Sequence, residues 1–210
     1  MPNPPTLSEF KTVVRDAFGY LRREFAFREA EPPASQVEGN PFVVWFVNAT
    51  TLVQVQGINW GFAAQVMLGP ADAGTEWDAT VPLWAIVKHR RPDLYNESAR
   101  SAGQLGDIRD YAHALREAAS DVLMGDFRVF ASARAIMEAQ AAQQRSHQQA
   151  EARDRNHMAA VKVAEAAFRA RDFGRVAELL GPHVDLLTPA ERAKLDYARA
   201  QIGRAPLGSG

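Results

Sequence analysis

The stretch of residues 105–130, LGDIRDYAHALREAASDVLMGDFRVF, constrains the fold more than any other part of the chain. Gly125 stands where a helix commonly ends in a left-handed residue, and Asp126 can cap a second helix that begins near Phe127. The stretch therefore predicts a helical hairpin that provides the helical layer of a domain mixing helices and strands. Its first helix has an apolar stripe at steps of three and four, made of Leu105, Ile108, Ala112, Leu115, Ala119 and Val122.

A second amphipathic helix is predicted near the start of the chain, over residues 6–30. Thr6 and Glu9 have the spacing of a capping box, which satisfies two free backbone amides. Glu31-Pro32-Pro33 should end the helix, because the residue before a proline is pushed out of the helical region. The apolar stripe consists of Leu7, Phe10, Val14, Phe18, Leu21 and Phe25.

Three strands are predicted between these helices. Residues 42–47 are apolar on both faces, as in a central strand. Residues 52–56 alternate, which predicts one covered face and one solvent-exposed face holding Gln54 and Gln56. Residues 62–68 return after a turn at 59–61, so the segment predicts an antiparallel meander. Residues 82–91 favour a short helix, with a fourth strand as the alternative. We expect an α+β domain with a three- to four-stranded antiparallel sheet covered by helices.

The second half of the chain is predicted to be helical. After Met137 the sequence is rich in Ala, Gln, Arg and Glu, which favour a helix but give it no apolar face. We expect a solvent-exposed connecting helix, with a flexible linker as the alternative. Three helices should follow, the last one capped by Thr188 and Glu191 around Pro189. Their stripes are Met158, Val161, Ala164 and Phe168; Val176, Leu179 and Leu180; and Leu195, Ala198 and Ile202.

The five residues LMGDF at 123–127 close the first helix of the hairpin. A helix ending in Leu-x-Gly-Asp-Phe after a short α+β segment resembles small bacterial proteins that accompany toxins. The resemblance covers roughly residues 1–135. It implies a non-enzymatic immunity-type protein that binds and neutralises a partner. It implies no particular site residues, because such proteins share a scaffold and not a site.

The segment AEAAFRARDFGRVAELLGP resembles a tetratricopeptide unit. Phe173 matches the aromatic that starts the second helix, Ala164 the small packing residue, and Val176 the small apolar residue of the second helix. The chain departs from the pattern at Arg171, where a glycine is usual, and at Ala160, where a bulky residue is expected. Because such repeats bury their faces on one another, a single copy should dock on the first domain, on a second copy of the chain as a homodimer, or on a partner.

Composition excludes several classes of function. A net charge of −1 gives no support for general nucleic-acid binding. The absence of cysteine excludes disulfides, thiolate catalysis and Cys-based zinc sites. The first ten residues lack a charged segment followed by an apolar run, and residues 41–49 form an apolar run too short to span a bilayer. We therefore expect a cytoplasmic protein without membrane contact.

No set of residues carries a catalytic signature. Asp110, His113 and Glu117 share a helix face, but a bundle metal site would need acidic residues from other helices as well. The pairs Asp107–Asp110 and Glu76–Asp78 could act as acid and base, although surface carboxylates are usually only solvated. We expect no metal and no cofactor, and we lean towards a protein that is not an enzyme.

A binding patch is the more informative hypothesis. Exposed tryptophan and arginine often dominate protein interfaces, and two tryptophans fall in predicted turns. The alternative is that each tryptophan folds back over the edge of the core. The candidate partner-binding residues are Trp60, Glu76, Trp77, Asp78, His89, Arg90 and Arg91.

These observations predict an α+β domain at 1–135, a polar helical connector at 136–156, a tetratricopeptide-like segment at 157–203 and a tail at 204–210. The expected function is protein binding, most specifically the steric neutralisation of a bacterial toxin. The alternatives are an enzyme or small-ligand binder with a cleft between sheet and helices, and an adaptor that binds only through the C-terminal helices.

Overall fold

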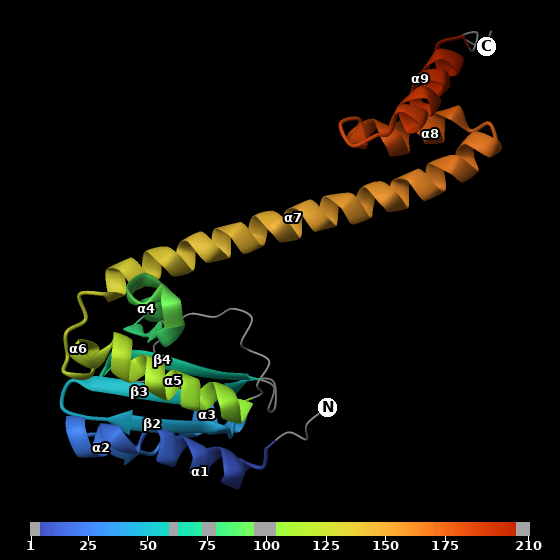
Figure 1. The fold of residues 1–210 in the computed structure, drawn as a ribbon. Helices are drawn as coiled ribbons and strands as arrows, with labels where there is room; N and C mark the ends of the chain where they lie inside the picture. The colour runs from blue at the N-terminus through green and yellow to red at the C-terminus, as the bar shows by residue number, and fades with distance from the viewer. Residues whose placement is uncertain (1–4, 59–62, 73–78, 95–103, 205–210) are drawn as a thin grey trace. The chain divides into compact units, whose positions relative to one another are not determined.

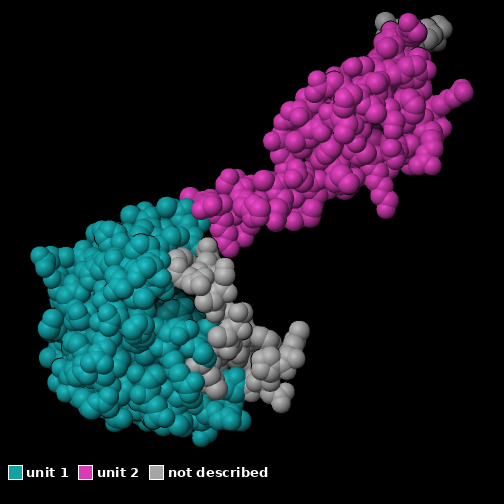
Figure 2. All heavy atoms as spheres, viewed as in Figure 1, with its two compact units in different colours: residues 1–140 teal, residues 141–210 magenta. Residues whose placement is uncertain are grey.

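The computed structural model describes residues 5–58, 63–72, 79–94 and 104–204, and the side chains of Gln104 and Leu105 are not among those described. The chain divides into two compact units, residues 1–140 and residues 141–210 (Figure 2). Each unit has a hydrophobic core of its own. No helix in the described part combines the length and the apolar composition that a membrane span requires.

Unit 1 is built on an antiparallel sheet with the strand order β1-β2-β3-β4-β5 (Figure 1). The three predicted strands are present as β2, β3 and β4, and the α+β class is confirmed. Two short strands at the edges raise the number within the described residues to five, above the expected three or four. The strands are β1 (Arg28–Ala30), β2 (Val43–Val47), β3 (Thr51–Ile58), β4 (Ala63–Pro70) and β5 (Val81–Pro82).

The main core lies between one face of this sheet and the helices. Alternate strand residues such as Phe46, Val53 and Val66 point into it and meet Phe10 and Leu115 from the helices. The opposite face is also buried, with a second cluster of Val43, Trp45 and Leu52. The prediction of a solvent-exposed face was wrong for Gln54, which is only 3% exposed. Alternation reveals which residues share a face, but not whether tertiary structure covers that face.

The predicted helix at 6–30 is two helices, α1 (Leu7–Ala17) and α2 (Gly19–Phe25). The capping box of Thr6 and Glu9 is present. However, α2 ends well before the prolines, at Phe25, and the next residue, Ala26, adopts a left-handed conformation with φ 55°. The chain leaves the helix early because residues 28–30 pair with β2 as a strand. Tertiary pairing therefore ends the helix before Pro32 could.

Shorter helices complete unit 1. These are α3 (Ala34–Gly39), α4 (Leu83–Arg90) and the 3₁₀ turn η3 (Pro92–Leu94). The predicted helix at 82–91 is confirmed as α4, while Val81 and Pro82 just before it pair with β4. Four residues of α4 are buried, which fixes this helix against the sheet: Leu83, Ala85, Ile86 and Val87.

The segment predicted to form a helical hairpin contains α5 (Gln104–Ala118), α6 (Ser120–Leu123) and α7 (Phe130–Arg169). The predicted first helix is interrupted at Ala119, whose backbone leaves the helical region with φ −140°. The second helix begins at Phe130 and runs for 40 residues. The connecting segment is therefore helical and continuous with the helix that follows it, and the flexible linker is wrong. Residues 142–150 of α7 are exposed throughout.

Unit 2 packs the end of α7 against α8 (Phe173–Leu180), the 3₁₀ turn η5 (Gly181–His183) and α9 (Pro189–Arg204). The predicted capping residues Thr188 and Glu191 bond to each other's backbone amides. Arg171, at the position of the missing glycine, is left-handed with φ 59°. Two predicted stripe residues, Met158 and Ile202, are exposed and lie outside the core, contrary to expectation. The core consists of Ala164, Val176, Leu180, Leu187, Leu195 and Ala198.

Candidate functional site

The turn that follows α6 is the most tightly specified feature on the surface of unit 1. Gly125 has φ 92°, as predicted for the residue after the helix. The amides of Met124 and Asp126 both donate to the carbonyl of Asp121, and the amide of Gly125 donates to that of Val122. These bonds satisfy carbonyls that a helix end otherwise leaves free. The turn is therefore closed by its own backbone.

Side chains of the turn between β2 and β3 cap the C-terminal end of α6. The Thr51 hydroxyl donates to the Val122 carbonyl at 2.9 Å, and the Asn48 side-chain amide donates to the Leu123 carbonyl at 2.9 Å. The Asn48 side-chain oxygen accepts from the amides of Thr50 and Thr51. The sequence did not predict a role for Asn48 and Thr51, because an Asn-x-Thr turn does not indicate which helix end it will contact.

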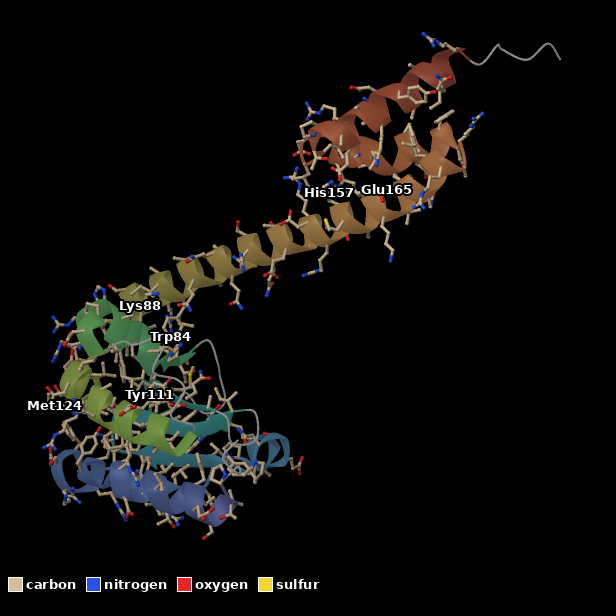
Figure 3. All side chains as sticks on the ribbon, turned by 45° about the vertical axis from the view of Figure 1, so that its right-hand side comes forward. Trp84, Lys88, Tyr111, Met124, His157 and Glu165 are labelled. Carbon is tan, nitrogen blue, oxygen red and sulfur yellow. The ribbon has the colours of Figure 1, made fainter. Side chains whose placement is uncertain are left out.

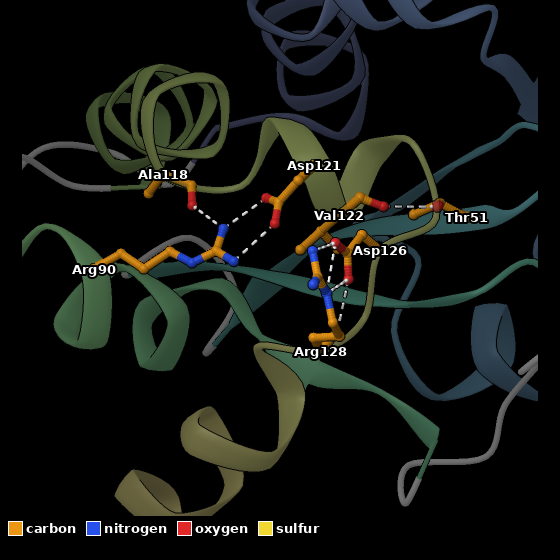
Figure 4. Close-up of polar contacts among 7 residues, drawn as sticks. All are labelled: Thr51, Arg90, Ala118, Asp121, Val122, Asp126 and Arg128. Atoms are coloured by element: carbon orange, nitrogen blue, oxygen red, sulfur yellow. Dashed lines mark hydrogen bonds and ion pairs between the residues drawn. The ribbon is translucent and has the colours of Figure 1, made fainter.

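Arg90 clamps the other side of α6. Its guanidinium donates to both carboxylate oxygens of Asp121, at 2.6 and 2.8 Å, and to the Ala118 carbonyl at 2.9 Å (Figure 4). The hydrogen bonds from Arg90 hold the pKa of the Asp121 carboxyl below its usual value. The clamp joins the end of α4 to the break between α5 and α6, so the turn is braced from two directions.

Asp126 does not cap a helix at Phe127, as was predicted. Its carboxylate accepts the Arg128 amide at 3.1 Å and pairs with the Arg128 guanidinium (Figure 4). The helix begins only at Phe130, after an intervening turn in which the Phe130 amide donates to the Phe127 carbonyl. The bonds from Arg128 lower the pKa of Asp126 to about 2. Arg128 itself projects outward, with 90% of its side chain exposed.

The braced turn presents an apolar side chain to solvent. Met124 is 68% exposed and lies at the outer edge of unit 1 (Figure 3). The charge of Arg128 opposes the raised pKa of Arg90, and Arg91 follows Arg90 at the end of α4. We call the group of His89, Arg90, Arg91, Met124 and Arg128 the Met124 surface.

The predicted binding residues fall into two groups. His89, Arg90 and Arg91 belong to the Met124 surface, where Arg91 bonds to Asp93 at 2.8 Å and lies 3.8 Å from Glu117. Arg90 has a structural role in addition, because it holds Asp121. The remaining candidates, Trp60, Glu76, Trp77 and Asp78, lie outside the described residues.

Among the described residues, the candidates for chemistry do not form a reactive set. Asp110, His113 and Glu117 are exposed on α5. Asp107 is buried, and one carboxylate oxygen accepts the Ala64 amide at 3.3 Å, which joins α5 to β4. Within the described part of the chain, no three acidic or histidine side chains are arranged to hold a metal ion.

Unit 1 also has a hollow of about 390 Å³ between α1, α2 and α5. It is not the cleft between sheet and helices that an enzyme or ligand binder was expected to have. Its lining contains His113 but not Asp107 or Asp110.

Comparisons with known proteins give no relative for this chain: no family model, no curated protein and no solved structure matches it.

Proposed function

We propose that this chain is a non-enzymatic protein-binding protein of the toxin-neutralising, immunity type, and that it holds its partner through the Met124 surface. The observation that carries the proposal is Met124 itself. A large apolar side chain with 68% exposure stands at the tip of a turn that is braced by two other parts of the fold. Contiguous exposed apolar patches rimmed by polar residues mark interaction sites, and we take Met124 to be the centre of such a patch.

The rigidity of the turn favours tight binding. Association costs conformational entropy wherever the interface must become ordered. Here the backbone around Met124 is held by Arg90, Asn48 and Thr51, so little ordering remains to be done. The surface meets its partner already in the binding conformation.

The chemistry of the surface indicates the kind of partner it fits. Methionine and arginine are enriched in interface cores, and arginine is prominent among hot spots. Arg128, four residues beyond Met124, and Arg91, at the end of α4, both have exposed side chains. A matching partner has an apolar pocket with acidic residues at its rim. Neutralisation would be steric, by covering the partner's active site.

A matched pair of variants tests the surface. Met158 of unit 2 is also 68% exposed, so Met158→Asp controls for placing a charge at an exposed methionine. Tagged full-length protein would be used for affinity capture from its source cells, and the recovered partner then purified for titration. We expect Met124→Asp to weaken binding at least tenfold, because it buries a charge in the interface, and Met158→Asp to bind like the unchanged chain.

The neutralising role needs a second measurement. The captured partner, produced alone, should arrest bacterial growth, and co-production of the unchanged chain should restore it. Met124→Asp should fail to restore growth. A partner that leaves growth unaffected argues against the immunity role, and binding lost only in Met158→Asp would assign the function to an adaptor using unit 2.

A further inference from the structure

The hollow between α1, α2 and α5 is lined by side chains that the Met124 surface does not use. Its walls are Asp16 and Ala17 of α1, Tyr20 of α2, and one stripe of α5. The α5 stripe places Arg109, His113 and Arg116 at successive turns of the helix, around Ala112. Its volume of about 390 Å³ falls within the range of small-ligand pockets.

One arginine in the hollow is held in place by its neighbours. Arg116 donates to both carboxylate oxygens of Glu24 at 2.9 Å, but through Nη2 alone. Its guanidinium carbon lies 5.4 Å from the centre of the Tyr20 ring, within cation–π range. The Tyr20 hydroxyl in turn donates to the Ala112 carbonyl at 3.1 Å. The guanidinium is therefore oriented while its Nε and Nη1 donors take no part in the Glu24 contact.

The hollow offers further donors. Arg109 and His113 have no hydrogen-bond or ion-pair partner among the described residues. Burial raises the pKa of the Tyr20 phenol, which keeps its proton and its bond to Ala112. Among the described residues, Asp16 is the only carboxylate in the lining. The walls are therefore richer in donors than in acceptors.

We propose that this hollow binds a carboxylate group, which accepts hydrogen bonds from Arg109, His113 and the free donors of Arg116. Guanidinium groups suit the planar geometry of a carboxylate. Asp16 on the facing wall disfavours anions of higher charge, such as phosphate, because like charges repel. The carboxylate can belong to a small molecule or to an acidic side chain of a protein.

Nuclear magnetic resonance of the uniformly ¹⁵N-labelled full chain tests the site. Sodium acetate would be titrated at constant ionic strength, balanced with sodium chloride. We expect saturable shifts confined to amides of residues 16–20 and 109–116. Arg109→Gln should weaken acetate binding roughly tenfold, as expected for the loss of a charge-assisted hydrogen bond. Arg22→Gln, which changes an exposed arginine outside the lining, should leave it unchanged.

Two further probes complete the test. Inorganic phosphate should bind more weakly than acetate. An acetylated, amidated tripeptide with a central glutamate distinguishes the sources: tighter binding than acetate supports a protein side chain, and weaker binding supports a free small carboxylate. Shifts that do not saturate, that persist in Arg109→Gln, or that are stronger with phosphate would overturn the proposal.

Discussion

Gly125 shows how one residue can be required by both backbone and packing. Its φ of 92° is costly for any residue with a side chain. A Cβ at this position would also lie 2.8 Å from the Cβ of Thr50 in the β2–β3 turn. The sequence pattern predicted the left-handed conformation, but the approach of Thr50 depends on two segments far apart in the chain.

Gly125→Ala should therefore destabilise the protein by about 1–3 kcal/mol, from the backbone strain and the displaced turn together. Urea unfolding followed by tryptophan fluorescence measures the change. Gly39→Ala is the matched control, because nothing lies within 4 Å of a Cβ there. Equal effects of the two substitutions would contradict this explanation.

The ion pair between Arg90 and Asp121 should make the free energy of unfolding depend on pH. Asp121 has a lowered pKa in the folded protein, with the hydrogen bonds from Arg90 as the largest cause. The pair therefore stabilises the fold above the ordinary aspartate pKa of about 4. That contribution is lost as the pH falls through the lowered folded value.

Arg90→Gln should cost about 1 kcal/mol at pH 7, since both partners are partly exposed and screened. The difference from the unchanged chain should shrink as the pH is lowered towards 3. Urea unfolding at a series of pH values gives both quantities, with Arg22→Gln as the control. A difference that stays constant with pH would exclude Asp121 as its source.

Among the elements, α7 is unusual because its middle is a helix without tertiary support. Residues 142–150 are exposed, and His147 contacts Glu151 on the next turn of the same helix at 3.1 Å. Helix propensity and i,i+4 pairs stabilise this segment, together with the anchored ends in the two cores.

Ala150→Pro should disrupt α7 locally at a cost of about 3 kcal/mol, because proline removes an amide donor and clashes with the preceding turn. Both cores should survive, since neither includes this residue. Hydrogen exchange should show faster exchange around residue 150 with unchanged protection in β3 and α9. Ala150→Ser is the control. Loss of protection throughout either unit would show that the middle of α7 supports that core.

The whole molecule contains two cores that share a helix but no buried residue. All four tryptophans belong to unit 1, so tryptophan fluorescence reports that unit alone. Helical ellipticity reports both units. The two signals can therefore separate the unfolding of one unit from that of the other.

Leu195→Ala should destabilise unit 2 by about 2–5 kcal/mol through cavity formation in its small core. The ellipticity transition should gain an early phase, while the tryptophan transition stays in place. Leu115→Ala in the larger core should do the opposite and shift the tryptophan transition. If Leu195→Ala moves both transitions together, the units unfold as one.

Features that depend only on neighbouring residues could be predicted along the chain. The stripes of α1 and α5, the capping boxes at Thr6 and Thr188, the left-handed Gly125 and the three long strands all follow from local spacing. Helix and strand periodicity and backbone capping act over a few residues, so they can be read along the chain.

Which of these local features contact one another depends on how distant segments of the chain pack. The pairing of β1 ends α2, and other parts of the fold cover the sheet face that holds Gln54. Arg90 is brought to Asp121, and Asn48 is brought to the end of α6. The segments that pair in this way lie from about 20 to 75 residues apart in the chain. Their energy comes from contacts that form only when distant segments pack. The contacts that brace the turn around Met124 also join distant segments. For that reason no pattern in the sequence singled out Met124.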